Sequence, residues 1–230
     1  MSDMILFIPT PHGAGVRLWG TQDELQEFYE TLQRFWNPVE EASSPLEYQR
    51  DIILACFCYD VRHGLMGMRT VAQQHPVNKT PGEFFAVEIT WTNILFYFSV
   101  LRYNMRTRPC TKKDVETICS AEDALRDAIS AYSKRYADAI MPYLDGAVYC
   151  SNPYLIQYME HINYKHLHWL QFSGPKEAFG YLASAMEGAV YNTYYYREIL
   201  QNLKKSAKRL GCEISQLSFD YDKPPFVFKW

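Results

Sequence analysis

The chain has 230 residues, of which 48% are hydrophobic and 21% are charged, and this balance excludes a disordered or fibrous protein. Its formal net charge is −3, so there is no global basic excess to hold a polyanion. The longest stretch without a charged or strongly polar residue, 94–101, is far shorter than the roughly 20 residues of a membrane-spanning helix. The opening Met-Ser-Asp-Met lacks the basic and apolar segments of a secretory signal. We therefore expect a soluble, cytoplasmic protein with no membrane association.

The first forty residues predict a hairpin followed by a helix. Hydrophobic residues at 4–8 and at 16, 18 and 19 flank a glycine-rich turn, which is typical of two paired strands. Thr21 and Glu24 have the spacing of a capping box, in which each side chain accepts a hydrogen bond from the other's backbone N–H. The helix that begins there should end at Asn37-Pro38.

The next segment predicts a buried helix, a polar loop, a strand and a second buried helix. Ser44-Pro45 combines an N-cap with a proline in the first turn, and we place the end of this helix near His63-Gly64. A polar loop should extend to residue 82. Apolar residues then alternate over 84–91, as in a strand with one buried face, and a nearly all-apolar helix covers 92–106.

The second half is predicted to be helical. One helix should run over 111–140, and Pro142 should prevent it from continuing further. A short helix should follow Asn152-Pro153. The longest predicted helix covers 175–211. The tail alternates aromatic residues at Phe226, Phe228 and Trp230, which favours an added strand.

These elements predict an α+β fold that is predominantly helical, a helical bundle with a small N-terminal antiparallel sheet. We expect a single domain over 1–230, because no linker or repeat interrupts the pattern. Within it, 1–106 holds the hairpin and first helices, 111–211 the long-helix bundle and 212–230 the tail strand.

A seam of apolar residues spaced by three and four runs along the predicted 175–211 helix and indicates a helical partner. That partner is either another part of this chain or a second copy of it. The residues that would form the interface are Leu182, Met186, Tyr196, Leu200 and Leu203.

The end of the helix that begins at Ser44 carries the densest polar group in an apolar setting. Asp60 and His63 are three residues apart on a helix, close enough for a carboxylate to orient the imidazole as an acid–base group. Arg62 would bind an anionic substrate group. The alternative is structural, with all three side chains satisfying backbone groups where a buried helix emerges.

Three histidines close together, His161, His166 and His168, offer ligands for a divalent metal such as zinc. A continuous helix would separate them, so a shared site needs a bend near Asn163. The alternative is a polar, aromatic-rich packing segment, and no other cofactor is expected.

Two basic clusters are candidates for an anion or nucleic-acid surface, although solvated helix ends explain them as well. Their members are Arg102, Arg106, Arg108, Lys112 and Lys113 in the first, and Lys204, Lys205, Lys208 and Arg209 in the second. The six cysteines show no Cys-x-x-Cys pair.

Three strings carry a resemblance to a known family. They are the opening Ile-Pro-Thr-Pro-His-Gly-Ala-Gly-Val-Arg-Leu-Trp, the helix end Tyr-Asp-Val-Arg-His-Gly-Leu-Met-Gly at 59–67, and the passage Phe-Ala-Val-Glu-Ile-Thr-Trp at 85–91. The chain resembles a bacterial family of domain-of-unknown-function proteins, clearly over about the first 105 residues. The resemblance implies a bacterial, cytosolic setting and assigns no reaction, cofactor or catalytic residue.

The absence of a recognised catalytic motif, together with the long apolar seam, favours a non-enzymatic module that binds a protein partner or itself. An enzyme using Asp60, Arg62 and His63 is the alternative. A nucleic-acid binder using the basic clusters is the third hypothesis, which the negative net charge disfavours.

Overall fold

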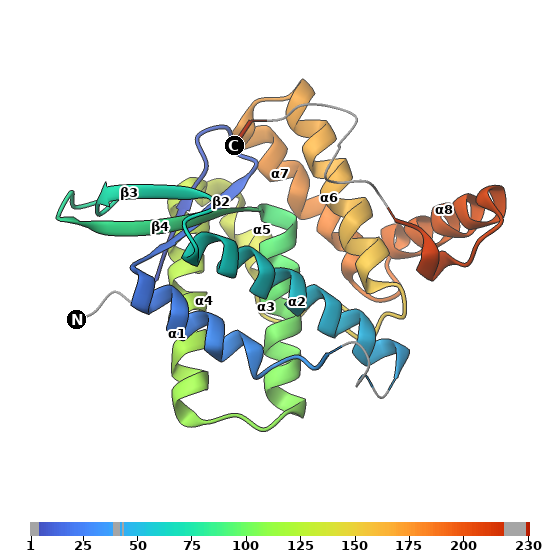
Figure 1. Ribbon diagram of the computed structural model, residues 1–230. Coiled ribbons are helices and arrows are strands. Elements are labelled where there is room, and N and C mark those ends of the chain that lie inside the picture. Colours follow the sequence, from blue (N-terminus) through green and yellow to red (C-terminus); the bar gives the residue numbers. More distant parts are fainter. Residues whose placement is uncertain (1–4, 39–41, 43, 219–228) are drawn as a thin grey trace.

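The computed structural model describes residues 5–38, 42, 44–218 and 229–230. The described residues form eight helices and one four-stranded antiparallel sheet, which confirms the predominantly helical α+β class; the β3–β4 hairpin projects at one side of the molecule (Figure 1). The strands are β1 (Leu6–Pro9), β2 (Gly15–Gly20), β3 (Thr70–Gln74) and β4 (Pro81–Thr90), in the spatial order β1–β2–β4–β3.

Several helices begin at the side-chain caps that the sequence contains. Thr21, Ser44 and Thr111 each accept a hydrogen bond from a backbone N–H in the first turn of their helix, and Thr21 and Thr111 complete capping boxes. The bounds are α1 Gln22–Gln33, α2 Pro45–Leu65, α3 Trp91–Thr107, α4 Lys112–Tyr132, α5 Lys134–Leu144, α6 Leu155–Phe172, α7 Pro175–Met186 and α8 Tyr194–Leu210.

One hydrophobic cluster joins the inner face of the sheet to helices of both halves of the chain. At its centre the ring of Phe57 from α2 stacks on Tyr97 from α3, with centroids 4.7 Å apart, and meets Phe28 from α1 edge-on at 5.6 Å. α3 is buried on nearly every side, as its apolar sequence predicted. The sheet, α1, α2 and α3 therefore form a rigid unit against which α4 packs beside β1.

Gly15 is fixed by the close approach of β2 and β4. A Cβ atom at Gly15 would lie 1.9 Å from the carbonyl oxygen of Ile89, so any other residue would push the strands apart. The turn between β1 and β2 is closed by Thr10, whose N–H donates to the Gly15 carbonyl at 2.9 Å.

The structure differs in detail from three predictions for the first half. α1 ends at Gln33, before the predicted stop at Pro38. α2 continues to Leu65, because Gly64 packs inside the helix against β4 and the positive φ of +67° belongs to Gly67. The predicted polar loop contains β3, an edge strand whose exposure removes the apolar alternation that marks most strands.

The second half also differs from the prediction. The 111–140 helix is divided at Ser133, whose extended backbone separates α4 from α5, while Pro142 lies inside α5. The helix after Pro153 is not short, since α6 has 18 residues without a break at Asn163.

The continuous helix predicted over 175–211 does not exist. α7 ends at Met186, a single 3-10 turn (η2, Glu187–Ala189) follows, and Asn192 adopts a left-handed φ of +61° before α8 begins. A Cβ at Gly188 would lie 2.4 Å from Ile199 Cδ1, so this glycine lets α8 fold back onto η2. Of the predicted tail strand, Phe226 and Phe228 lie outside the described residues, and Trp230 is in no strand.

Candidate functional site

At the end of α2, the structure gives Asp60 a different partner from Arg62 and His63. Asp60 accepts a hydrogen bond at Oδ2 from the Tyr97 hydroxyl at 3.2 Å, and burial raises the pKa of its carboxyl to about 6. His63 packs on the ring of Tyr59 with centroids 3.9 Å apart, and the exposed Arg62 guanidinium lies 5.6 Å from that same ring. Among the residues described, no hydrogen bond joins Asp60 to His63, so the predicted acid–base pair is not assembled here.

The three α6 histidines occupy different environments. His166 is fully buried, His161 is half-buried and His168 is exposed, with its ring stacked on Tyr164. Burial lowers the pKa of His161 and of His166 to about 4, which keeps both rings neutral near pH 7. The described part of the chain holds no cluster of three or more metal-ligating side chains, so the geometry lends the histidine metal site no support.

The predicted interface residues pack mostly within their own chain. Leu182, Met186 and Leu203 are at most 1% exposed and belong to the hydrophobic core, while Tyr196 and Leu200 are partly buried against it. Most of this seam therefore packs on other parts of the same chain, and Tyr196 and Leu200 keep part of their surface exposed.

The two basic clusters differ in their partners. Four of the five cations in the first cluster are in ion pairs: Arg102 with Glu122, Arg108 with Glu47 and Asp51, Lys112 with Glu116, and Lys113 with Glu27. The second cluster lies on α8, where none of the four has an ion-pair partner among the described residues. The first cluster is thus largely neutralised within the chain.

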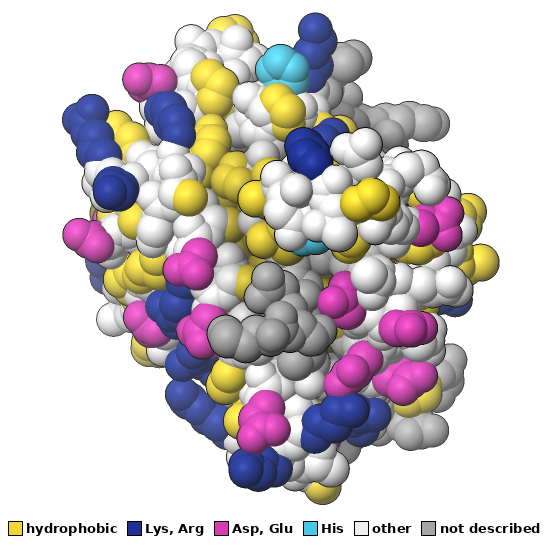
Figure 2. All heavy atoms as spheres, turned by 90° about the vertical axis from the view of Figure 1, so that its left-hand side faces the viewer, with side chains coloured by type: hydrophobic (Ala, Val, Ile, Leu, Met, Phe, Trp, Pro, Cys, Tyr) yellow, Lys and Arg dark blue, Asp and Glu magenta, His cyan; other side chains and the backbone are white. Residues whose placement is uncertain are grey.

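A groove of about 840 Å³ runs between β1, α4 and the tip of the β3–β4 hairpin. Figure 2 views the molecule from the left-hand side of Figure 1, and it shows a hollow lined by hydrophobic side chains on this face. The groove is lined by residues 5–9 along β1, by His75, Val77 and Asn78 of the tip, and by Ser120, Asp123, Ala124, Asp127, Ala128 and Ala131 of α4. Such a volume is in the range of sites that bind small molecules or short peptide segments.

The α4 wall of the groove is made by small side chains that recur along one face of the helix. Its groove residues recur at intervals of three and four, so they share one face, and the opposite face buries larger residues such as Ile118, Leu125 and Ile129. The groove face carries three alanines and a serine. These small side chains leave space beside β1 that leucines or isoleucines would fill.

The hairpin tip forms the other wall and is held by His75. The imidazole Nδ1 accepts hydrogen bonds from the backbone N–H groups of Val77, at 3.3 Å, and Asn78, at 3.2 Å. The ring also meets Phe84 edge-on at 5.1 Å, and Lys79 takes a φ of +62° to close the turn. The tip therefore has a defined shape, with Val77 62% exposed at the groove.

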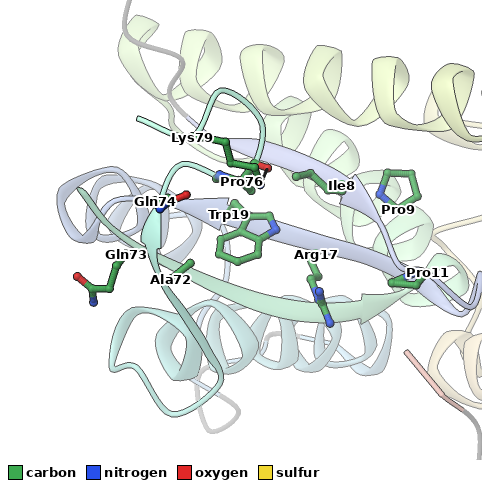
Figure 3. A pocket seen from close by; sticks show the side chains of 10 residues that line it. All are labelled: Ile8, Pro9, Pro11, Arg17, Trp19, Ala72, Gln73, Gln74, Pro76 and Lys79. Atoms are coloured by element: carbon green, nitrogen blue, oxygen red, sulfur yellow. Dashed lines mark hydrogen bonds between the residues drawn. The ribbon is translucent and has the colours of Figure 1, made fainter. Parts of the chain in front are cut away.

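A second hollow of about 510 Å³ adjoins the groove on the outer face of the sheet and shares Ile8 and Pro9 with it. Figure 3 shows Trp19 at its centre, with Arg17 on one side and the hairpin residues Gln74 and Pro76 on the other. Trp19 is 7% exposed, and its indole N–H has no hydrogen-bond partner among the described residues. The two hollows form one continuous surface that crosses β1 at Ile8 and Pro9. The second hollow is also lined by the polar or charged side chains of Arg17, Gln73, Gln74 and Lys79.

The charge along this surface is uneven. The charged residues that line the α4 groove are both acidic, Asp123 and Asp127, which lie one turn apart on the helix. Both are exposed, and neither has an ion-pair partner in the part of the chain that the structure describes. The groove is therefore apolar along its floor and negative along one rim.

Sequence reasoning missed this groove because its parts look ordinary one at a time. Exposed Asp123 and Asp127 are typical of a solvated helix face, and the alanines beside them are good helix formers. One available signal is that the small residues repeat at three and four along α4. The other wall depends on β3, which was not predicted.

The described residues form a predominantly helical α+β domain with an apolar groove between β1, α4 and the hairpin tip. The chain belongs to the family described as Domain of unknown function (DUF6904), whose model matches residues 5–230. This confirms the resemblance to an uncharacterised domain family, and extends it from the first 105 residues to nearly the whole chain. No curated protein and no solved structure matches the chain. In the described residues, no helix has both the length and the apolar character needed to cross a membrane.

Proposed function

We propose that this protein is a protein-interaction module whose groove between α4 and β1 binds an extended apolar segment of a partner protein that carries a lysine or arginine. The observation that carries the proposal is the combination of an apolar groove with two unpaired carboxylates on its rim, among the residues that the structure describes. A polypeptide partner agrees with the non-enzymatic interpretation of the sequence.

The dimensions of the groove favour a short segment of extended chain. The α4 wall from Ser120 to Ala131 is about 16 Å long at 1.5 Å per residue. The β1 wall, residues 5–9, is about 13 Å long at the strand spacing of 3.3 Å per residue. An extended partner segment of about five residues matches both walls.

The charge of the rim favours a basic side chain in the partner. Asp123 and Asp127 lie about 6 Å apart along one helix face, so a lysine ammonium can approach both and an arginine can bind one in a bidentate manner. An acidic segment would meet repulsion at the same place. The apolar floor would contribute most of the affinity, and the carboxylates would select the partner.

A selection with random heptapeptides displayed on phage tests the proposal without knowledge of the partner. Immobilised wild-type protein should enrich sequences with apolar residues and a lysine or arginine. Ala124→Trp places a large ring in the groove and should abolish the enrichment, as should the charge reversal Asp123→Lys/Asp127→Lys. Ala139→Trp and Asp138→Lys, at exposed positions of α5 outside the groove, are the matched controls and should keep it.

Thermal melts of all variants establish that they are folded. Enrichment that survives both groove variants, or enrichment of acidic sequences, would overturn the proposal. A dimer of the wild-type protein in sedimentation that Ala124→Trp dissociates would also overturn it, because the groove would then hold a second copy.

A further inference from the structure

Helix α8 lies at one side of the molecule, away from the sheet and from α4 (Figure 1). Its buried stripe, Ile199, Leu203 and Ala207, packs on its own chain, and the Tyr158 hydroxyl donates to the Tyr196 carbonyl at 2.9 Å. The helix is therefore fixed in place by one face, and its opposite face points to solvent.

That solvent face is strongly basic. Five exposed cations lie on α8, against one acidic residue, Glu198. The cations are Arg197, Lys204, Lys205, Lys208 and Arg209. Spacings of seven, eight and eleven residues from Arg197 place most of them on one side of the helix, over a length of about 18 Å.

None of these five cations is paired within the described part of the chain. No salt bridge to any of them is found there, in contrast to the largely paired cluster near α3 and α4. Cations in the last turn commonly complement the helix dipole, which accounts for Lys208 and Arg209. It does not account for Arg197, Lys204 and Lys205, which lie farther from that end.

Exposed tyrosine rings lie at the N-terminal end of the same helix. Tyr194 is 69% exposed, Tyr195 is 41% exposed and Tyr191, just before α8, is 62% exposed. Exposed aromatic rings beside unpaired cations are the two components with which proteins bind single-stranded nucleic acid, since cations hold the phosphates and rings stack on the bases.

We infer that the solvent face of α8 binds single-stranded nucleic acid, with the lysines and arginines on the phosphates and the tyrosines against bases. An anionic membrane surface fits less well. Most of the aliphatic stripe of α8 is buried against its own chain, so it offers no apolar face for insertion into lipid. This site is independent of the proposed groove.

Fluorescence anisotropy with a fluorescein-labelled 20-nucleotide oligouridine tests the inference, with the full chain and a salt titration. Binding should weaken steeply with salt, with a slope of log K against log salt near −3, about −0.7 for each of four or five phosphate contacts. Lys204→Glu/Lys205→Glu/Lys208→Glu should lower affinity at least about tenfold at low salt and flatten the slope.

Two further comparisons separate this site from nonspecific charge. Lys112→Glu/Lys113→Glu/Lys134→Glu makes the same change in net charge on α4 and α5 and should have a much smaller effect. Tyr194→Ala/Tyr195→Ala should weaken binding about fivefold or more while leaving the salt slope unchanged, because stacking releases no counterions.

Three results would overturn the inference. One is the absence of binding at 50 mM salt at protein concentrations up to about 100 μM, the weak end of ordinary nonspecific affinity. Another is an equal loss in the two triple variants. The third is tighter binding to vesicles containing phosphatidylserine than to the oligouridine, which would assign the face to membranes.

Discussion

At the scale of single residues, the titratable groups that are shielded from water give the clearest physical signatures. Burial raises the pKa of Asp60 and lowers the pKa of His166, so that each side chain favours its neutral form. The two shifts make the stability of the fold depend on pH in opposite directions. For Asp60, the folded chain binds a proton more tightly than the unfolded chain, and for His166 it binds one less tightly.

The substitution Asp60→Asn should stabilise the protein above pH 6. The carboxyl has a pKa near 6 when folded and 3.8 ordinarily, so the wild type loses stability as pH rises from about 4 to 6. The amide oxygen of the introduced asparagine can still accept from the Tyr97 hydroxyl. We expect a gain of about 1–2 kcal/mol at pH 7, after allowance for partial exposure, and none below pH 4, by urea unfolding at each pH. A loss at pH 7 would show instead that the charged carboxylate stabilises the fold.

The substitution His166→Leu should remove an acid-dependent loss of stability. His166 has a pKa near 4 when folded and 6.5 ordinarily, so its contribution is complete above pH 6.5 and is lost as pH falls toward 4. Both ring nitrogens are buried without a hydrogen-bond partner among the described residues, so leucine leaves none unsatisfied. Between pH 7 and 5 we expect the wild type to lose about 2 kcal/mol more than the variant, by urea unfolding. Equal losses in the two proteins would place the acid sensitivity elsewhere.

At the scale of elements, sequence patterns predicted starts better than ends. Thr21, Ser44 and Thr111 cap helices where expected, because a cap is a local hydrogen bond between neighbouring residues. The break between α7 and α8 was missed because the apolar spacing of three and four continues across it. Both helices bury one face in the same core. The apolar spacing therefore indicates which residues are buried, and it does not indicate whether they lie on one continuous helix.

The hairpin tip provides a prediction at the same scale. His75→Ala removes the acceptor for two backbone N–H groups and the contact with Phe84, so the tip should lose its fixed shape. Hydrogen exchange of Val77 and Asn78 should speed up, and peptides selected on the wild type should bind at least several-fold more weakly. Unchanged exchange together with unchanged affinity would show that the tip does not shape the groove.

At the scale of the whole molecule, the fold class followed from composition and periodicity, but the candidate site did not. The groove exists only where β1, the hairpin tip and α4 meet, and these segments are separated by about 70 and 45 residues in the chain. No local sequence pattern indicates that these three segments lie side by side in the fold. Asp60, Arg62 and His63 stood out because charged residues in an apolar run are visible locally. In the structure, however, Asp60 bonds to Tyr97, whereas Arg62 and His63 both contact the ring of Tyr59.

The central claim is that the α4 carboxylates recognise a basic residue in a bound peptide. The most direct test is a double-mutant cycle by isothermal titration calorimetry, with a peptide selected on the wild type. It compares the wild type with Asp123→Asn/Asp127→Asn, and the peptide with a copy in which norleucine or alanine replaces its basic residue. We predict a coupling energy of about 1 kcal/mol or more between the two changes, declining with added salt. A coupling energy of zero, with the basic residue contributing equally to binding of both proteins, would contradict the account.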